Sequence, residues 1–445
     1  MRKSLFLQVL AQSLLAGDLT ARPCISRFSW TLGRRWAWLP PLANRFAKAF
    51  KDGTRPRERD IIRFLSRDPG LTRAWRKDSK KLSVAHWLNQ PQKMRPVPAA
   101  RSWKVPPLES TGALARWLGV DVAELEWFAD RKGLAGKQAI SKLRHYYYTI
   151  LAKRAGSLRL IEAPKVRLKQ IQQKMLAEIL SRIPPHPAAH GFVRERSIKT
   201  FVASHVGRRV VLRMDLKDFF PSFPATRIQA VFRTLGYPEA VADLLGGLCT
   251  SATPGDVWGR AAFGEDTLHL WESRAEAQAL YSRRHLPQGA PTSPALANIC
   301  SYRLDCRLTG LAKAAGAIYT RYADDLAFSG DLEFERVVER FAIHVAAILH
   351  EEGFQVHHRK TRIMRQGVRQ HLAGLVTNKR LNIRRQDFDR LKAILTNCAR
   401  TGPSAQNRES HPFFREHLEG RVGFMEMINA QKGAHVRALF ERIHW

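Results

Sequence analysis

The sequence predicts an α+β protein, and three observations support this fold class. Segment 319–330, YTRYADDLAFSG, has apolar or aromatic residues on both sides of two aspartates, which is typical of two strands joined by a tight turn. The apolar run VVLRM at 210–214 has the length of a short buried strand. From Arg384 to the end the pattern is helical, so strands are expected in the middle of the chain and helices after them. The residues on one face of the first such helix are Phe388, Leu391, Ile394 and Leu395.

Length and charge indicate a large globular protein with a polyanionic partner. The chain has 445 residues, 44% of them hydrophobic and 25% charged, so two or three domains are expected. Its 74 Lys and Arg against 39 Asp and Glu give a formal net charge of +35, which suits nucleic acid. A basic membrane-surface protein is the alternative, but no apolar run is long enough to span a bilayer. Five cysteines without a Cys-x-x-Cys pair predict neither a zinc site nor a disulfide framework, which fits a reducing cytoplasm.

Residues 1–105 form the first predicted domain, a basic and mainly helical extension. Its tryptophans alternate with clusters of Lys and Arg. Because basic groups contact phosphates and aromatic rings stack on bases, the extension could bind RNA. The equally weighted alternative is a small helical domain whose tryptophans form the core and whose charges are solvated. The tryptophans are Trp30, Trp36, Trp38, Trp75, Trp87 and Trp103.

Two short helices and a strand–helix unit follow a proline-rich linker. Gly119 is expected to end the first helix, and Asp121 to cap the second. Residues 156–176 have the pattern of a strand followed by an amphipathic helix with basic side chains. Among these, Arg159 and Lys169 could meet a nucleotide triphosphate or a template phosphate, although a charge run is usually a solvated face.

Three carboxylates are the candidate catalytic and metal-binding groups. The strand at 210–214 delivers Asp215 at its end, and the adjacent pair Asp324 and Asp325 sits at the predicted turn. Neighbouring carboxylates repel each other, and Mg²⁺, which prefers oxygen ligands, would compensate their burial. The structural alternatives are a helix N-cap for Asp215 and an exposed hairpin turn for the pair. Three carboxylates on two elements suit phosphoryl transfer with two Mg²⁺ ions, about 3.5–4 Å apart.

Further residues complete this chemistry. Lys360 could act as the general acid that protonates a leaving pyrophosphate. Phe220 lies five residues after Asp215, close enough to flank the same pocket. In the Gly- and Pro-containing turn LPQGAPTSPALANI, Gln288 can hydrogen-bond a base or sugar. The pattern predicts a nucleotide polymerase, with a nuclease as the competing interpretation.

Five segments in this order resemble the palm motifs of reverse transcriptases: VVLRMDLKDFFPSF, LPQGAPTSPALANI, RYADDLAFSG, GFQVHHRKTRI and HLAGLVTN. The LPQGAPTSP form and the segment around Val376 and Thr377 are most similar to bacterial retron reverse transcriptases. The resemblance covers roughly residues 110–445, and the number and order of the motifs make chance matches implausible. It implies a right-hand fold with fingers and palm over 106–378, an insertion near 251–285, and a helical thumb over 379–445.

The resemblance also implies roles for individual residues. The three aspartates would bind two Mg²⁺ ions, and Lys360 matches the motif lysine. Phe220 would select deoxyribonucleotides by crowding a 2′-OH. The expected nucleotide-binding set, near the incoming nucleotide or the template, is Phe220, Gln288, Gly289, Arg159 and Lys169.

Family members copy part of a structured non-coding RNA from a guanosine 2′-OH within it and leave a branched RNA–DNA product, msDNA. They commonly act in anti-phage defence beside an effector protein. The expected partners are therefore the cognate RNA, its msDNA, deoxynucleotides and an effector protein, with no membrane.

Two segments depart from the retron pattern, and both are expected to concern RNA recognition. The run 201–205, which ends at His205, lacks the Asn of the family's Asn-Ala-x-x-His. The family's Val-Thr-Gly is here Val376, Thr377 and Asn378. Because Asn tolerates positive φ better than most residues, we expect the turn to persist.

Two alternatives remain beside the retron hypothesis. A group II intron reverse transcriptase and maturase usually shows Pro-Gln-Gly-Gly, where this chain has Ala290 in the last position, and usually has a longer C-terminal region than 379–445. A catalytically silent RNA-binding scaffold would be expected to lack one of the aspartates, and all three are present.

Overall fold

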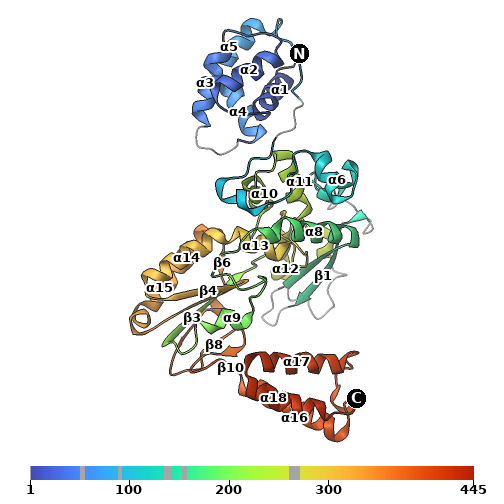
Figure 1. The fold of residues 1–445 in the computed structure, drawn as a ribbon, viewed down its shortest axis with the longest axis vertical. Coiled ribbons are helices and arrows are strands. Elements are labelled where there is room, and N and C mark those ends of the chain that lie inside the picture. The colour runs from blue at the N-terminus through green and yellow to red at the C-terminus, as the bar shows by residue number, and fades with distance from the viewer. Residues whose placement is uncertain (1, 51–55, 89–92, 135–142, 153–157, 260–270) are drawn as a thin grey trace. The chain divides into compact units, whose positions relative to one another are not determined.

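The computed structural model describes residues 2–50, 56–88, 93–134, 143–152, 158–259 and 271–445 (Figure 1). The chain divides into two compact units, the first made of Met1–Arg182 with Ala225–Arg284 and the second of Ile183–Pro224 with His285–Trp445. The chain therefore passes from one unit to the other three times. No helix within the described ranges is long and apolar enough to cross a membrane.

The first unit begins with five helices that share one apolar core (Figure 1). The buried side chains include Phe6, Phe28 and Phe46, and Trp36, Trp38 and Trp75 pack partly buried against them. The packing alternative for the tryptophans therefore holds for these three, whereas Trp30 and Trp87 are exposed. The helices are α1 (Lys3–Leu15), α2 (Ala21–Thr31), α3 (Leu39–Ala49), α4 (Glu58–Arg67) and α5 (Pro69–Asp78).

The rest of the first unit contains an antiparallel hairpin and further helices. Gly119 ends α6 in the left-handed conformation, and the Asp121 carboxylate accepts a hydrogen bond from the Glu124 amide at the start of α7, as predicted. The elements are η1 (Pro98–Trp103), α6 (Thr111–Leu118), α7 (Val122–Ala129), β1 (Tyr146–Ala152), β2 (Leu158–Pro164), α8 (Val166–Glu178), η4 (Leu180–Arg182), α10 (Ala225–Thr234), α11 (Glu239–Leu248), η5 (Gly255–Trp258) and α12 (Trp271–Tyr281).

The segment 251–285, interpreted as an insertion without a clear period, contributes to the core of this unit. Trp258 and Tyr281 are buried against Leu158 and Leu160 of β2. Residues 260–270 of the segment lie outside the described part of the chain.

A five-stranded antiparallel sheet lies at the centre of the second unit (Figure 1). Its order is β4-β5-β3-β6, and β7 pairs with β3. The strand predicted at 210–214 is longer than expected, so Asp215 lies inside a strand and the N-cap alternative is wrong. The elements are α9 (Ile198–Ala203), β3 (Val210–Lys217), α13 (Ser293–Cys300), α14 (Tyr302–Ala314), β4 (Ile318–Tyr322), β5 (Asp325–Gly330), α15 (Leu332–Glu351), β6 (Gln355–Val356), η8 (His358–Lys360) and β7 (Arg362–Arg365).

The second unit ends in a small sheet and three helices. Residues 371–383 supply the three strands of the small sheet, in the order β10-β9-β8. The predicted helical face is also present, because Leu391 and Leu395 are buried and Phe388 and Ile394 pack against the same core. The elements are β8 (His371–Leu372), β9 (Leu375–Val376), β10 (Asn382–Ile383), α16 (Arg385–Thr401), η9 (Ser404–Gln406), α17 (Phe414–Ile428) and α18 (Ala430–Glu441).

Candidate active site

Strand pairing brings the three aspartates together in the second unit. Asp215 of β3 lies directly opposite Asp325 of β5 in the antiparallel register. The Leu216 amide donates to the Asp324 carbonyl at 2.9 Å, which fixes the turn against the same strand. Because directly opposite residues have Cβ atoms about 4.5–5.5 Å apart, the carboxylates share one site.

The turn that presents this pair is conformationally strained. Ala323 has φ of 56°, the left-handed region that non-glycine residues seldom adopt. Such a residue costs about 1–2 kcal/mol and persists only where its surroundings hold it in place. Contacts from two parts of the second unit hold Ala323 in this conformation.

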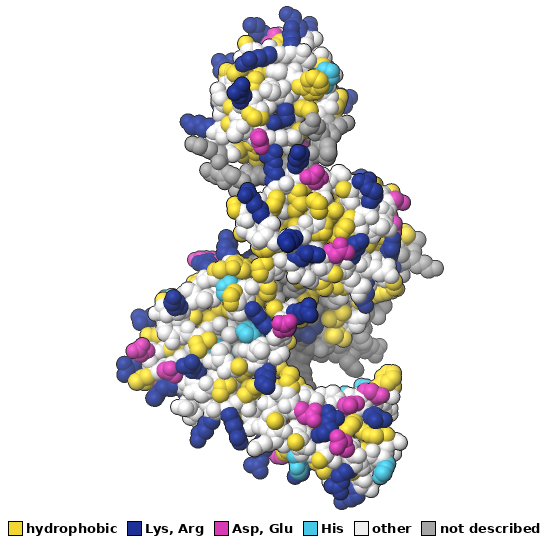
Figure 2. Space-filling model, in the orientation of Figure 1, with side chains coloured by type: hydrophobic (Ala, Val, Ile, Leu, Met, Phe, Trp, Pro, Cys, Tyr) yellow, Lys and Arg dark blue, Asp and Glu magenta, His cyan; other side chains and the backbone are white. Residues whose placement is uncertain are grey.

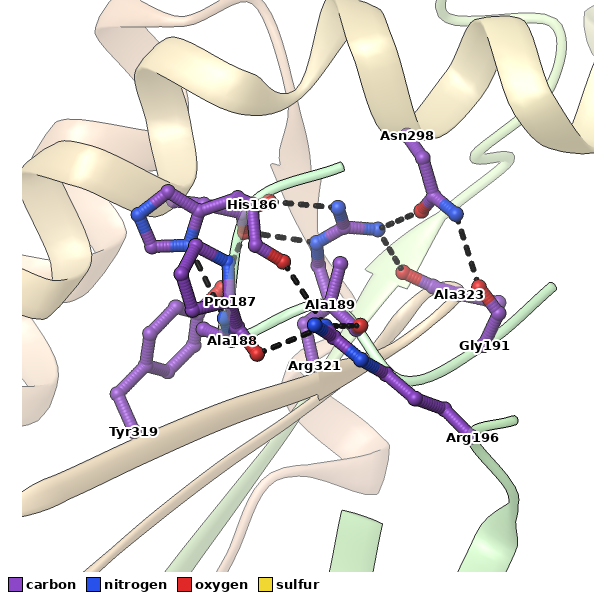
Figure 3. Close-up of polar contacts among 11 residues, drawn as sticks. His186, Pro187, Ala188, Ala189, Gly191, Arg196, Asn298, Tyr319, Arg321 and Ala323 are labelled. Atoms are coloured by element: carbon purple, nitrogen blue, oxygen red, sulfur yellow. Dashed lines mark hydrogen bonds and ion pairs between the residues drawn. The ribbon is translucent and has the colours of Figure 1, made fainter. Parts of the chain in front are cut away.

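A buried arginine lies directly beneath the turn (Figure 3). The Arg321 side chain has no exposed surface, and its guanidinium donates to both carboxylate oxygens of the equally buried Asp305 at 2.8 and 2.6 Å. A second edge of the guanidinium donates to the Asn298 side chain and to the Ala323 carbonyl, both at 3.1 Å. The Tyr319 hydroxyl also donates to Asp305, at 2.8 Å. This network ties the strained residue to helices α13 and α14.

The segment 186–196 packs against the other side of the turn (Figure 3). The Arg321 amide donates to the Ala188 carbonyl, and its carbonyl accepts from the His190 amide, each at 2.7 Å. A Cβ added at Gly191 would lie 2.6 Å from the Ala323 nitrogen, so only glycine permits this approach. The Asn298 side chain donates to the Gly191 carbonyl at 2.8 Å.

Arg196 holds this segment in its bent path (Figure 3). Its Nη1 donates to the carbonyls of His186, Pro187 and Ala189 at 3.1, 2.9 and 2.6 Å. One cation thus satisfies three main-chain acceptors that no strand pairing would satisfy. The turn is consequently fixed from two sides.

Basic side chains contact two of the three aspartates. Lys360 Nζ lies 2.8 Å from Asp215 Oδ2, and Arg213 donates to both oxygens of Asp325 at 2.7 and 2.8 Å. Burial, reinforced by the charge of Asp215, raises the pKa of Asp324 to about 6. Burial also raises the pKa of Asp325, although Arg213 opposes the rise. The site therefore favours positive charge.

The donor set fits a divalent cation. Within the described ranges, no three His, Cys, Asp or Glu side chains already form a group that could hold a metal ion. The three aspartates nevertheless supply only hard oxygen donors, and their burial and mutual repulsion raise the pKa of Asp324 in the absence of a cation. A cation could enter by replacing the ammonium of Lys360 on Asp215.

Three aromatic rings border the site. Phe220 is half-buried, and its ring centroid is 6.2 Å from that of Phe192. Phe192 is 50% exposed, has φ of 60°, and lies 6.4 Å from the ring of Tyr322, which precedes the turn. Phe192 therefore lies between Phe220, the residue predicted to select deoxyribonucleotides, and the hairpin that carries the aspartates.

The other predicted nucleotide-binding residues are divided between the two units. Gln288 is half-buried in the second unit, and the following Gly289 is exposed with φ of 132°, a conformation that favours glycine. Arg159 on β2 and Lys169 on α8 are exposed, but both belong to the first unit. Their approach to the nucleotide stays a prediction.

His205, expected to take part in RNA recognition, is inside the protein. Its ring has no exposed surface, and its two nitrogens lie 2.6 Å from Ser329 Oγ and 2.7 Å from Thr320 Oγ1. Burial lowers the pKa of His205 to about 3, so the ring is neutral. Direct contact with RNA is excluded in this structure, because the side chain joins the segment after α9 to the β4–β5 hairpin instead.

The second RNA-recognition candidate also differs from expectation. Thr377 is buried, while Val376 and Asn378 are half-buried. The expected positive φ at Asn378 is wrong, since the left-handed residues of this hairpin are Ala373 and Gly374. The Asn378 side chain instead accepts from the Gln370 amide at 2.9 Å and donates to the Val368 carbonyl at 2.8 Å.

Three residues of the site, Arg213, Arg321 and Phe192, were not predicted from the sequence. Arg213 precedes Asp215 by two residues, so strand alternation placed both on one face of the sheet, and this signal was available. Arg321 precedes the aspartate pair within the quoted motif, but its partner is on a helix sixteen residues earlier. Phe192 lies outside the five motif segments.

Comparison with known proteins finds reverse transcriptases, both among protein families and among individual relatives. Residues 151–386 match the family described as reverse transcriptase (RNA-dependent DNA polymerase). Retron Mx65 reverse transcriptase of Myxococcus xanthus is 40% identical over 326 residues, which cover 72% of this chain and 68% of that protein. Retron Mx162 reverse transcriptase of the same organism is 36% identical over 348 residues, covering 75% of this chain and 67% of that protein. Retron Ec86 reverse transcriptase of Escherichia coli is 31% identical over 290 residues, covering 65% of this chain and 78% of that protein.

Proposed function

The chain belongs to the reverse transcriptases of bacterial retrons, and on that premise we propose that it copies part of a structured non-coding RNA, starting from an RNA 2′-OH, into msDNA. Membership of the family makes the chain an RNA-directed DNA polymerase with a right-hand polymerase fold. The similarity to retron enzymes argues against the intron-type alternative. Because the family consists of active polymerases, it also argues against the silent-scaffold alternative.

The observation that carries the proposed chemistry is the convergence of Asp215, Asp324 and Asp325 on one strand pair. We assign these residues to hold two Mg²⁺ ions, because hard cations prefer carboxylate oxygens. Bound there, the ions would supply the positive charge that activates a hydroxyl and neutralises the phosphates in transfer.

The remaining residues prepare the substrates. Lys360, now 2.8 Å from Asp215, would be released by a cation and could donate a proton to the leaving pyrophosphate. Phe220, supported by the ring of Phe192, would crowd a ribose 2′-OH and so favour deoxyribonucleotides. Gln288 and Gly289 would hold the base pair being formed, and Arg159 and Lys169 would meet phosphates.

The proposed biological setting is the one that the resemblance to retron reverse transcriptases implies. The RNA-recognition segments, including 376–378, would select the cognate RNA through their surface. The msDNA and an effector protein would then act together in anti-phage defence. These parts of the proposal rest on the resemblance to that family, since the residues described above concern polymerisation.

The direct test is to identify the nucleic acid that copurifies with the protein. The protein would be expressed with its native flanking DNA, and the bound nucleic acid treated with ribonuclease and a debranching enzyme and then sequenced. Asp215→Asn serves as the inactive variant, and Asp331→Asn, on an exposed carboxylate at the start of α15, as the matched control. One short DNA species linked to RNA through a 2′ bond, absent only from Asp215→Asn, is the expected result. Absence of DNA despite activity on an added primer and template would refute RNA 2′ priming while leaving a reverse transcriptase.

A further inference from the structure

We propose that the N-terminal helices carry a stacking platform for single-stranded RNA. The platform is formed by Trp30, Trp87 and His86, which precedes Trp87 and stacks on Trp30. The platform belongs to the first unit and shares no residue with the active site. It is an additional binding site, separate from the polymerase chemistry.

Two tryptophans of this domain are exposed, although the domain has a core that accepts others. Trp30 is 58% exposed and Trp87 is 53% exposed. Trp36, Trp38 and Trp75 pack against the common core of the same five helices. Exposure of two large aromatic rings is unfavourable in water, and it is typical of a binding surface.

The rings are held in a defined arrangement. The centroids of Trp30 and His86 are 4.4 Å apart, and the two planes differ by 21°, so the rings are stacked. The amides of Ala85 and His86 donate to the Thr31 carbonyl at 2.9 and 3.2 Å, which fixes segment 85–87 beside the end of α2.

Gly33 permits this close approach. Its φ is 70°, and an added Cβ would lie 2.8 Å from the Cβ of Ala85. Leu82, buried in the common core, fixes the segment at its other end. A ring pair supported in this way is ordered before any ligand binds, which reduces the conformational entropy lost on binding.

The charge around the platform selects a polyanion over an apolar protein partner. Residues 1–105 contain 23 Lys and Arg and 6 Asp and Glu. On the face shown in Figure 2, these helices carry many more basic than acidic side chains. Arg34 and Arg35 follow Trp30 closely and are exposed, and the Arg34 guanidinium carbon lies 3.6 Å from the ring centroid of Trp36.

Aromatic rings that stack on bases, beside cations that contact phosphates, characterise proteins that bind single-stranded nucleic acid. Bases inside a duplex are already stacked, so the ligand must be single-stranded. We assign RNA because the template RNA is present before any DNA has been made.

The test measures binding of a labelled, unstructured oligouridine to the full chain by fluorescence anisotropy. A saturating, unlabelled RNA–DNA primer duplex occupies the polymerase site throughout. The variant Trp30→Ala/Trp87→Ala should bind roughly ten- to a hundred-fold more weakly, and Trp30→Phe, which keeps a stacking ring, should bind nearly as well as the original. Trp127→Ala, on a partly exposed tryptophan of α7, is the matched control and should not change binding.

Salt dependence separates stacking from phosphate contacts. Arg34→Ala/Arg35→Ala should reduce the slope of log affinity against log salt by about one to two, whereas the tryptophan variant should leave the slope unchanged. Thermal unfolding of each variant checks that the domain is intact.

Two outcomes would overturn the proposal. The first is an unchanged affinity of Trp30→Ala/Trp87→Ala, and the second is an equal loss in Trp127→Ala. DNA synthesis on an added primer and template should persist in every variant, so failure of this proposal is distinguishable from failure of the polymerase assignment.

Discussion

Replacing Arg321 with methionine tests how the aspartate turn is supported. Arg321 and Asp305 have fully buried side chains, and the guanidinium binds both carboxylate oxygens. Methionine would leave the carboxylate buried with the Tyr319 hydroxyl as a donor but without its counter-charge. Breaking a buried pair in this way costs about 3–5 kcal/mol of the free energy of unfolding. We expect a loss of that size together with a loss of DNA synthesis.

A second variant separates stability from positioning. Arg321→Met combined with Asp305→Leu and Tyr319→Phe replaces the charged pair by apolar groups of similar total volume and removes the orphaned hydroxyl. Such replacements are often neutral, so most of the stability should return. DNA synthesis should stay roughly a hundred-fold low, because the Ala323 carbonyl still lacks its donor and a misplacement of about 1 Å can have that effect.

The assays are urea unfolding of the full chain and steady-state primer extension on an added template. Arg303→Met is the control, since Arg303 is 75% exposed and its partner Glu352 keeps Arg307. Recovery of synthesis together with stability in the combined variant would refute the positioning role. A loss below about 1 kcal/mol in the single variant would refute the energetic argument.

Three further predictions concern the active site itself. Asp215→Asn should abolish DNA synthesis while RNA binding persists, and substantial residual synthesis would contradict the assigned metal site. Phe220→Ala should raise ribonucleotide incorporation in single-nucleotide extension. An unchanged preference for deoxyribonucleotides would contradict the role of Phe220 in crowding the 2′-OH. The folded-state pKa of Asp324, about 6 against a usual 3.8, means that the folded protein holds this proton more tightly, so stability is lost as pH rises between those values. In EDTA, the stability of Asp324→Asn relative to the original should therefore increase from pH 4 to pH 7 by up to about 3 kcal/mol, and a constant difference in urea unfolding would contradict this cause.

The sequence was sufficient to find the three aspartates, because the residues next to them in the chain predict the strands that carry them. An apolar run preceding Asp215 and apolar residues on both sides of the pair predict strands, and the pairing of these strands joins the sites. The helical face at Leu391 and Leu395 was equally readable from its period.

Side-chain contacts between residues far apart in the sequence could not be predicted in this way. The contact of Arg213 with Asp325 depends on the register of two strands more than a hundred residues apart. Burial of His205 depends on the packing of α9 against the hairpin, and a motif match alone could not show that both ring nitrogens are engaged. For the same reason, periodicity could not show that Trp36 packs in the core while Trp30 is exposed.

Two unfavourable features of the second unit occur together at the aspartate turn. Ala323 is in the left-handed region, and the two carboxylates that follow it have raised pKa values. Contacts from Arg321 and from the segment at Gly191 hold this arrangement. A buried ion pair contributes little net stability compared with apolar groups of the same volume. The position of Arg321 is therefore better explained by the geometry it imposes on the aspartates than by its contribution to the free energy of unfolding.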